Sequence, residues 1–340
     1  MALGTLIKTD RKLYPASGVV TKQGGDPARD FWLDASRKDR GRRNASLRNI
    51  GNRGDLLTSS HNPSSAPGHS GLPSPSISIR TLSGLSLEIF KFRLQLGRRF
   101  LNLGEMCVCR IGWGAIAKFG PSIRFTEALT MKFVAESTTI PIPRVLDMFT
   151  IRGRLFMVME YIDAPSLDRV WHTLSATEKR SVLLQLQGYL RQLRSLRPPH
   201  PGIVEAADGT GCLDKRQQGE PFGPFTVDEF HTFLGHDYLH QKKDLYPQFQ
   251  ADFERCAGRT YDTHFTHGDL APRNILVRNG SIVGIIDWEC AGWFPSYWEY
   301  TRNWFSNFDC QEMWELFQEI ADPYPDELRV EQDLADVFFR

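Results

Sequence analysis

The sequence lacks several features that would assign it to a common class of protein. It has no run of 18 apolar residues, so we expect no membrane-spanning helix and no membrane partner. Its first ten residues have no apolar core that would mark a secretory signal. Its six cysteines form no Cys-x-x-Cys pair. We therefore expect a cytoplasmic protein with reduced thiols.

Glutamate is missing from the first 80 residues, which differ from the rest of the chain. Residues 1–55 carry 12 Lys or Arg against 6 Asp, although the whole chain has a net charge of only +1. Residues 58–80 contain 8 Ser, 4 Pro and 2 Gly, a composition that cannot bury enough apolar surface to fold. We predict a disordered tail over residues 1–80. Its basic cluster at 37–43 is either a solvated run or a nuclear or nucleic-acid-binding patch, and the overall charge gives no clear indication of nucleic-acid binding.

The pattern of a folded chain begins at about residue 85. Short apolar stretches at 106–110 and 115–119 predict two strands, joined by a turn at Gly112-Trp113-Gly114. Apolar residues four apart predict a helix over 125–136. The continuous apolar run at 155–159 predicts a buried strand.

Helical signals dominate the remainder of the chain. Ser-Ala-Thr-Glu at 175–178 and Thr-Val-Asp-Glu at 226–229 are capping boxes, and the second predicts a helix through about residue 240. Asn279-Gly280 separates two β-rich runs and predicts a hairpin. Aromatic helices should follow over 297–320. The order predicts an α+β protein with a small β-rich part and a larger, mostly helical part.

Three oxygen-bearing side chains lie around this hairpin. Residues 265–277 read FTHGDLAPRNILV, and residues 285–289 read IIDWE. Asp269 and Asn274 are five apart, and the tight turn should return Asp287 to the side of Asn274. Phosphoryl transfer needs a carboxylate near the attacking hydroxyl, and Mg²⁺ prefers carboxylate and amide oxygens as ligands. The alternative is that these residues serve only as caps and turn formers.

The two segments resemble the catalytic loop of the aminoglycoside phosphotransferase and choline kinase branch of the kinase-like fold. That branch carries His-Gly-Asp-Leu-x-x-x-x-Asn and then Ile-Ile-Asp-Trp. The sequence at 291–300 is similar to that of fungal members called phosphotransferase enzyme family proteins. The resemblance covers about residues 98–320. It implies a two-lobed protein-kinase-like fold, with an N-lobe over 85–162 and a helical C-lobe over 163–340.

The resemblance also implies roles for four residues of the catalytic loop. Asp269 corresponds to the base that orients and deprotonates the acceptor hydroxyl. Asn274 and Asp287 correspond to the magnesium ligands. His267 corresponds to the residue that supports the loop from behind the base, without touching substrate.

Four further residues correspond to the ATP-binding side of such a site. Lys118 resembles the strand lysine that contacts the α- and β-phosphates, and Glu127 resembles the helix carboxylate paired with it. The hinge would use backbone groups at Glu160 and Ile162 to bind adenine. Taken alone, Lys118 reads equally as a surface lysine on an edge strand, and Glu127 as a solvated carboxylate at a helix start.

The phosphate-covering loop is weakly marked. The sequence contains no Gly-x-x-x-x-Gly-Lys, which excludes a Walker-type loop, and no Gly-x-Gly-x-x-Gly. Gly112 and Gly114 lie too close to Lys118 to cover a phosphate. Residues 102–105 would have to supply this loop.

These observations predict an enzyme that uses ATP and Mg²⁺ to phosphorylate a hydroxyl of a small molecule. A protein kinase is less favoured, because only 53 residues follow Asp287 (340 − 287), no Ala-Pro-Glu occurs and position 271 is Ala. A nucleotide-binding pseudokinase with weak or no turnover is the second alternative. We expect residues 187–241 to supply much of the acceptor pocket, and Asp228 and Glu229 could receive a cationic amine alcohol. The choice of ATP over GTP and the oligomeric state stay open.

Overall fold

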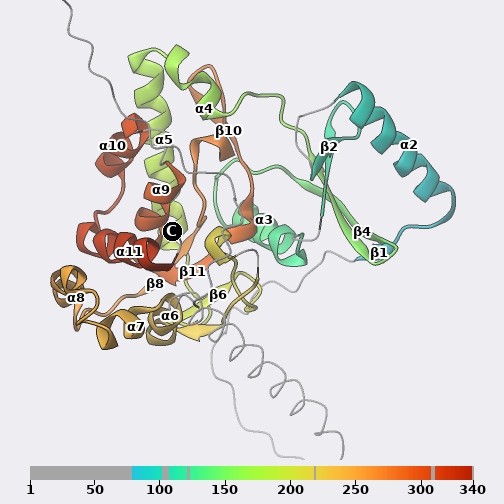
Figure 1. Cartoon of the computed structure of the whole chain (residues 1–340). Helices are drawn as coiled ribbons and strands as arrows, with labels where there is room; N and C mark the ends of the chain where they lie inside the picture. Colours follow the sequence, from blue (N-terminus) through green and yellow to red (C-terminus); the bar gives the residue numbers. More distant parts are fainter. Residues whose placement is uncertain (1–78, 102–106, 121–122, 218–219, 308–310, 339–340) are drawn as a thin grey trace, which may run out of the picture.

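The chain folds into two lobes (Figure 1), and Lys118 of the smaller lobe contacts Asp287 of the larger one. The computed structural model describes residues 79–101, 107–120, 123–217, 220–307 and 311–338. The smaller N-lobe contains a five-stranded sheet and two helices, and the larger C-lobe is mostly helical. The predicted α+β, two-lobed architecture is therefore confirmed. The segment proposed for the phosphate-covering loop, 102–105, lies outside the described residues.

The N-lobe sheet has the order β1-β4-β5-β3-β2, and only the β1–β4 pair is parallel. Its two faces are covered by different helices: Phe90 of α2 packs in one cluster with Ala117, and Met131 of α3 packs in another with Met157. Lys118 lies on β3, an interior strand between β5 and β2, opposite Met157 of β5. The bounds of these elements are β1 (Arg80–Thr81), α2 (Gly84–Phe100), β2 (Val108–Arg110), β3 (Ala115–Phe119), α3 (Phe125–Ser137), β4 (Val145–Ile151) and β5 (Arg154–Glu160).

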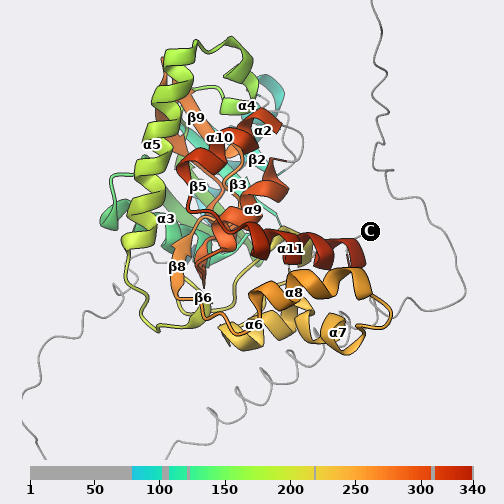
Figure 2. The ribbon, with the colours of Figure 1, turned by 90° about the vertical axis from the view of Figure 1, so that its left-hand side faces the viewer.

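The C-lobe begins after β5 and is built along the long helix α5 (Ala176–Ser195). The predicted capping box closes its first turn, since the Ser175 hydroxyl accepts from the Glu178 N–H and the Glu178 carboxylate accepts in return. The apolar stripe of α5 packs on the core that holds Trp288 and Trp293. The other helices of this lobe are α4 (Leu167–Val170), α6 (Val227–Leu234), α7 (His236–Gln241), α8 (Gln250–Cys256), α9 (Trp298–Ser306), α10 (Gln311–Ile320) and α11 (Pro325–Phe338). Figure 2 shows α6, α7 and α8 grouped on one side of α11.

The predicted hairpin forms between β9 (Ile275–Arg278) and β10 (Ser281–Ile285). Asn279 and Gly280 both have positive φ, 51° and 69°, as the tight turn requires. Beyond the paired strands, the Ile286 N–H donates to the Asn274 carbonyl at 3.0 Å. The turn therefore brings the residue before Asp287 directly beside Asn274.

A second sheet in the C-lobe has no counterpart in the sequence prediction. Its order is β7-β6-β11-β8, and its strands are β6 (Ile203–Ala206), β7 (Phe225–Thr226), β8 (Thr263–Thr266) and β11 (Gly292–Pro295). These strands are two to four residues long, too short to show a period of two in the sequence. The sheet anchors the start of the catalytic loop, because β8 pairs with β11 immediately before His267.

One sequence prediction needs correction. The helix expected to run from 227 to about 240 is interrupted at Gly235, whose φ of 99° ends α6 before α7 begins. The predicted tail over residues 1–80 lies outside the described residues except for its last two. Of these, Arg80 is ordered in β1, where its guanidinium donates to Asp147 at 2.6 Å. Among the described helices, none is long and apolar enough to cross a bilayer.

The turn glycine gives a direct test of how the hairpin is held. A Cβ on Gly280 would need a left-handed backbone and would lie 2.9 Å from Cγ of Glu178. Gly280→Ala should lower the free energy of unfolding by about 1–2 kcal/mol. The matched control is Gly188→Ala in α5, where a Cβ meets nothing within 4 Å; it should raise that free energy by about 0.5–1 kcal/mol. Urea unfolding measures both, and equal effects of the two variants would contradict this view of the turn.

Candidate functional site

The catalytic loop follows β8 and is shaped by one glycine. Gly268 has a φ of 74°, and a Cβ there would lie 2.5 Å from the carbonyl oxygen of Cys290. Only glycine fits this close approach between backbones. Asp287 is also left-handed, with φ 66° and ψ 59°, which is uncommon for a residue with a side chain. Both departures from ordinary geometry lie where the loop and the end of β10 converge.

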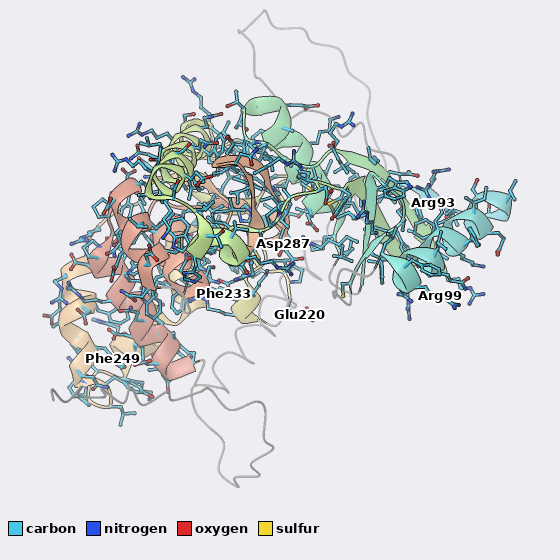
Figure 3. The ribbon with its side chains drawn as sticks, turned by 90° about the horizontal axis from the view of Figure 1, so that it is seen from above. Arg93, Arg99, Glu220, Phe233, Phe249 and Asp287 are labelled. Atoms are coloured by element: carbon cyan, nitrogen blue, oxygen red, sulfur yellow. The ribbon has the colours of Figure 1, made fainter. Side chains whose placement is uncertain are left out.

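Lys118 enters the site from the N-lobe and meets three carboxylates. Its ammonium donates to Glu127 at 2.8 and 3.0 Å, to Asp287 at 2.8 Å and to Glu289 at 3.3 Å. Burial alone would lower the pKa of Lys118, but the charges of these carboxylates outweigh it and raise the pKa. The lysine therefore remains a cation, and it joins α3 of one lobe to the end of β10 in the other. Figure 3 shows Asp287 in the region where the two lobes meet.

A second lysine, Lys215, enters the site from the C-lobe and was not identified from the sequence. Its ammonium donates to Asp269 at 2.6 Å and to Asp287 at 2.9 Å, and it lies 3.9 Å from Glu289. Burial would lower its pKa, but the charges of Asp287 and Asp269 raise it. No motif surrounds this residue in the sequence, and only the folding of the chain between β6 and β7 brings it here.

Asp269 is almost completely buried, with 2% of its surface exposed, and is surrounded by donors. Besides Lys215, Arg273 donates to both of its oxygens at 2.7 and 2.8 Å, and the Ser306 hydroxyl donates at 2.9 Å. The Asn274 amide donates to its backbone carbonyl at 2.8 Å and to its carboxylate at 3.1 Å. Burial would raise the pKa of Asp269, but Lys215 and Arg273 hold it below its usual range. The carboxylate is therefore ionised and fixed in orientation.

His267 and Glu299 hold the loop from the inside. The Nε2 atom of His267 lies 3.1 Å from the Ile286 carbonyl, and its Nδ1 accepts from the Asp269 N–H at 3.3 Å. Burial lowers the pKa of His267, so the ring is neutral. The carboxylate of Glu299 accepts from the His267 N–H at 2.5 Å and from the Gly268 N–H at 3.4 Å. Glu299 was not assigned a role from the sequence, although it lies in the Trp-Glu-Tyr stretch that carries part of the resemblance.

The expected hinge lies at the end of β5. Glu160 pairs with Ala115 of β3, and its N–H donates to the Arg144 carbonyl at 2.9 Å. Two residues on, the Ile162 carbonyl accepts from the Ala164 N–H at 3.0 Å. The adenine-binding role of the backbone groups at Glu160 and Ile162 stays a prediction.

The donors suit a hard divalent ion rather than a soft one. Asp287 offers a carboxylate and Asn274 an amide oxygen, both favoured by Mg²⁺. Within the described residues, no three His, Cys, Asp or Glu side chains are grouped as a self-sufficient metal site. A metal held here by Asn274 and Asp287 therefore needs further oxygens from water or from a phosphate ligand, which is typical of Mg²⁺ sites in phosphoryl transfer.

The region expected to bind the acceptor contains a cavity of about 570 Å³ between α6, α7, α8 and α11. Asp228 lines it, whereas the Glu229 carboxylate is used to cap α6 by accepting from the Thr226 N–H at 3.0 Å. None of the residues described above around Lys118, Lys215 and Asp269 lines this cavity. An acceptor role for Asp228 and Glu229 therefore stays a prediction.

Comparisons with known proteins identify the family and the fold. The model of the phosphotransferase enzyme family matches residues 122–322. Among solved structures, aminoglycoside phosphotransferase APH(4)-Ia is similar at 16% identity and a TM-score of 0.50, over 74% of this chain and 89% of that chain. Macrolide 2'-phosphotransferase MphH from Brachybacterium faecium is similar at 14% identity and a TM-score of 0.43, over 72% and 88%. No curated protein matches the chain.

Glu299 gives the site a measurable pH dependence. Burial raises its pKa from 4.5 to about 7, against the opposing effect of the two N–H donors. Between pH 4.5 and 7 the folded protein keeps a proton that the unfolded chain releases, so this group stabilises the fold less as the pH rises. Glu299→Gln keeps an oxygen acceptor but cannot titrate. Between pH 4.5 and 7, the free energy of unfolding of this variant should fall less steeply with pH than that of the wild type. The two slopes should differ by at most about 1.4 kcal/mol per pH unit. Urea unfolding at pH 5 and pH 7 measures this change. An equal change in the free energy of unfolding in the variant and the wild type would contradict the prediction.

Proposed function

Since this chain belongs to the phosphotransferase enzyme family, whose members are kinase-type enzymes that phosphorylate an alcohol group, we propose that it transfers the γ-phosphoryl group of ATP to a hydroxyl of a small molecule. Magnesium would be required for the transfer.

The observation that carries the proposal is the meeting of a lysine from the N-lobe and a carboxylate from the end of the hairpin. The Lys118 ammonium lies 2.8 Å from both Glu127 and Asp287. Lysine, helix carboxylate and hairpin carboxylate are the groups that hold the phosphates and metal in kinases. A lysine on an exposed edge strand, the alternative reading of the sequence, would not be buried among three carboxylates.

Asp269 acts on the acceptor hydroxyl in this proposal. Arg273, Ser306 and Lys215 fix its carboxylate in one orientation, and it accepts the proton as the acceptor oxygen attacks phosphorus. Its lowered pKa makes it a weak base, which suits a loose transition state in which the hydroxyl proton leaves late. Its main contribution is to orient the hydroxyl.

The other residues bind the donor. Asn274 and Asp287 would hold Mg²⁺, which neutralises charge on the β- and γ-phosphates when bound. Lys118 would turn from Asp287 to the α- and β-phosphates while keeping its contact with Glu127. The Glu160 carbonyl and the Ile162 N–H would bind the adenine edge. Similar enzymes have been solved with nucleotide and acceptor, among them APH(4)-Ia with ADP and hygromycin B, and this supports ATP and a small hydroxylated acceptor as the ligand classes.

The base gives the first test of this proposal. Asp269→Asn keeps the size and most hydrogen bonds of the side chain but cannot take a proton. Magnesium-dependent ADP release by the variant should be slower than the wild-type rate by about 10²–10⁴-fold. The matched control is Asp262→Asn, seven residues earlier and exposed, which should leave the rate unchanged. Equal rates for Asp269→Asn and wild type would favour the pseudokinase reading, and preferential labelling of protein substrates would favour a protein kinase.

A further inference from the structure

Lys215 is held in the site by its neighbours in the chain. It opens a short 3-10 helix, Lys215–Gln217, in the segment between β6 and β7. The preceding Asp214 and the following Arg216 pair at 2.9 Å, and Arg216 also reaches Glu331 of α11 at 3.0 Å. Asp214 is 4% exposed and Glu331 is 1% exposed, so these charges are locked inside the C-lobe. The backbone is therefore fixed on both sides of Lys215, whose ammonium reaches Asp269 and Asp287.

The position of the Lys215 ammonium is unusual for a lysine with only a structural role. It lies 2.6 Å from an oxygen of Asp269 and 2.9 Å from an oxygen of Asp287. In the proposed function, Asp269 faces the attacking hydroxyl, while Asp287 faces the phosphates of the donor. The phosphoryl group must pass between these two positions, and the ammonium lies between them.

We propose that Lys215 is a further catalytic residue, whose ammonium contacts the transferred phosphoryl group. This inference rests on the proposed function. As the acceptor oxygen bonds to phosphorus, the bond from phosphorus to the β–γ bridging oxygen breaks, the hydroxyl proton passes to Asp269, and ADP leaves with the bridging oxygen. Lys215 remains protonated throughout. Its charge offsets the negative charge on the equatorial oxygens, the contribution that a fixed cation makes in phosphoryl transfer.

The same contact makes Lys215 a competitor of the metal ion. Lys118 holds one oxygen of Asp287 at 2.8 Å and Lys215 holds the other at 2.9 Å. Lys118 is tied more firmly, because it also donates twice to Glu127. Without nucleotide, when Lys118 keeps its contact, a divalent ion that binds Asp287 would therefore displace Lys215 from this carboxylate. The displaced ammonium, still anchored by its neighbours, is then free to turn to the phosphoryl group.

Two measurements on one variant test this inference: the affinity for Mn²⁺ should rise and the kcat should fall. Lys215→Gln keeps one donor but removes the charge. The nucleotide-free variant should bind Mn²⁺ more tightly than wild type, by about three- to tenfold, because two carboxylates lose a competing cation. The kcat for magnesium-dependent ADP release should fall by about 10²–10³-fold, with the KM for ATP within about threefold. Lys215→Arg, which retains the charge, should keep more of the kcat than Lys215→Gln and should not tighten Mn²⁺ binding.

The control is Lys179→Gln, which removes a lysine whose ion pair is with Glu312, at 2.9 Å. It should change neither Mn²⁺ affinity nor kcat. An unchanged kcat in Lys215→Gln beside an active wild type would overturn the role of Lys215 alone. Weaker Mn²⁺ binding in that variant would show that Lys215 supports the metal site rather than competing with it, and would also overturn the inference. A wild-type protein that releases no ADP with magnesium would overturn the proposed function and the role of Lys215 together.

Discussion

The arrangement of the site depends on the carboxylate of Asp287, which binds a lysine from each lobe. One of its oxygens is bound by Lys118 from the N-lobe sheet, and the other is bound by Lys215 from the segment between β6 and β7. Its backbone is held in a left-handed conformation with φ 66°, at the end of a hairpin set by Asn279 and Gly280. One side chain therefore joins three parts of the chain that are distant in sequence.

This arrangement brings several carboxylates close together, and the lysines offset the repulsion between them. Desolvation and neighbouring carboxylates would raise the pKa of every acid in the site. Asp269 and Asp287 nevertheless have lowered pKa values, because two cations lie beside each carboxylate: Lys215 and Arg273 beside Asp269, and Lys118 and Lys215 beside Asp287. Glu127 is fully inside the protein, and burial raises its pKa to about 7. In the proposed function, a metal ion and a polyphosphate replace these internal cations.

The sequence predicted those parts of the site that are marked locally. The spacing of Asp269 and Asn274, the Asn-Gly turn before Asp287 and the capping box at Ser175 are each encoded within a few residues. Lys215 could not be predicted in this way. It contacts Asp269, 54 positions later in the sequence, only because of the tertiary fold, and no local motif marks that contact. The C-lobe sheet was missed because its pairing partners lie far apart: Gly292 of β11 pairs with Ala206 of β6.

The central claim is that Asp287 and a magnesium ion together hold the phosphates of a nucleotide, and calorimetric titration with ADP tests it most directly. Wild-type protein should bind ADP at least about tenfold more tightly with Mg²⁺ than with a chelator present, because a metal held by Asp287 adds contacts to the phosphates. In Asp287→Asn this gain should disappear, while metal-free binding stays the same or improves through lost repulsion. Equal ADP affinity of the wild type with and without Mg²⁺, or an undiminished gain in Asp287→Asn, would contradict the account.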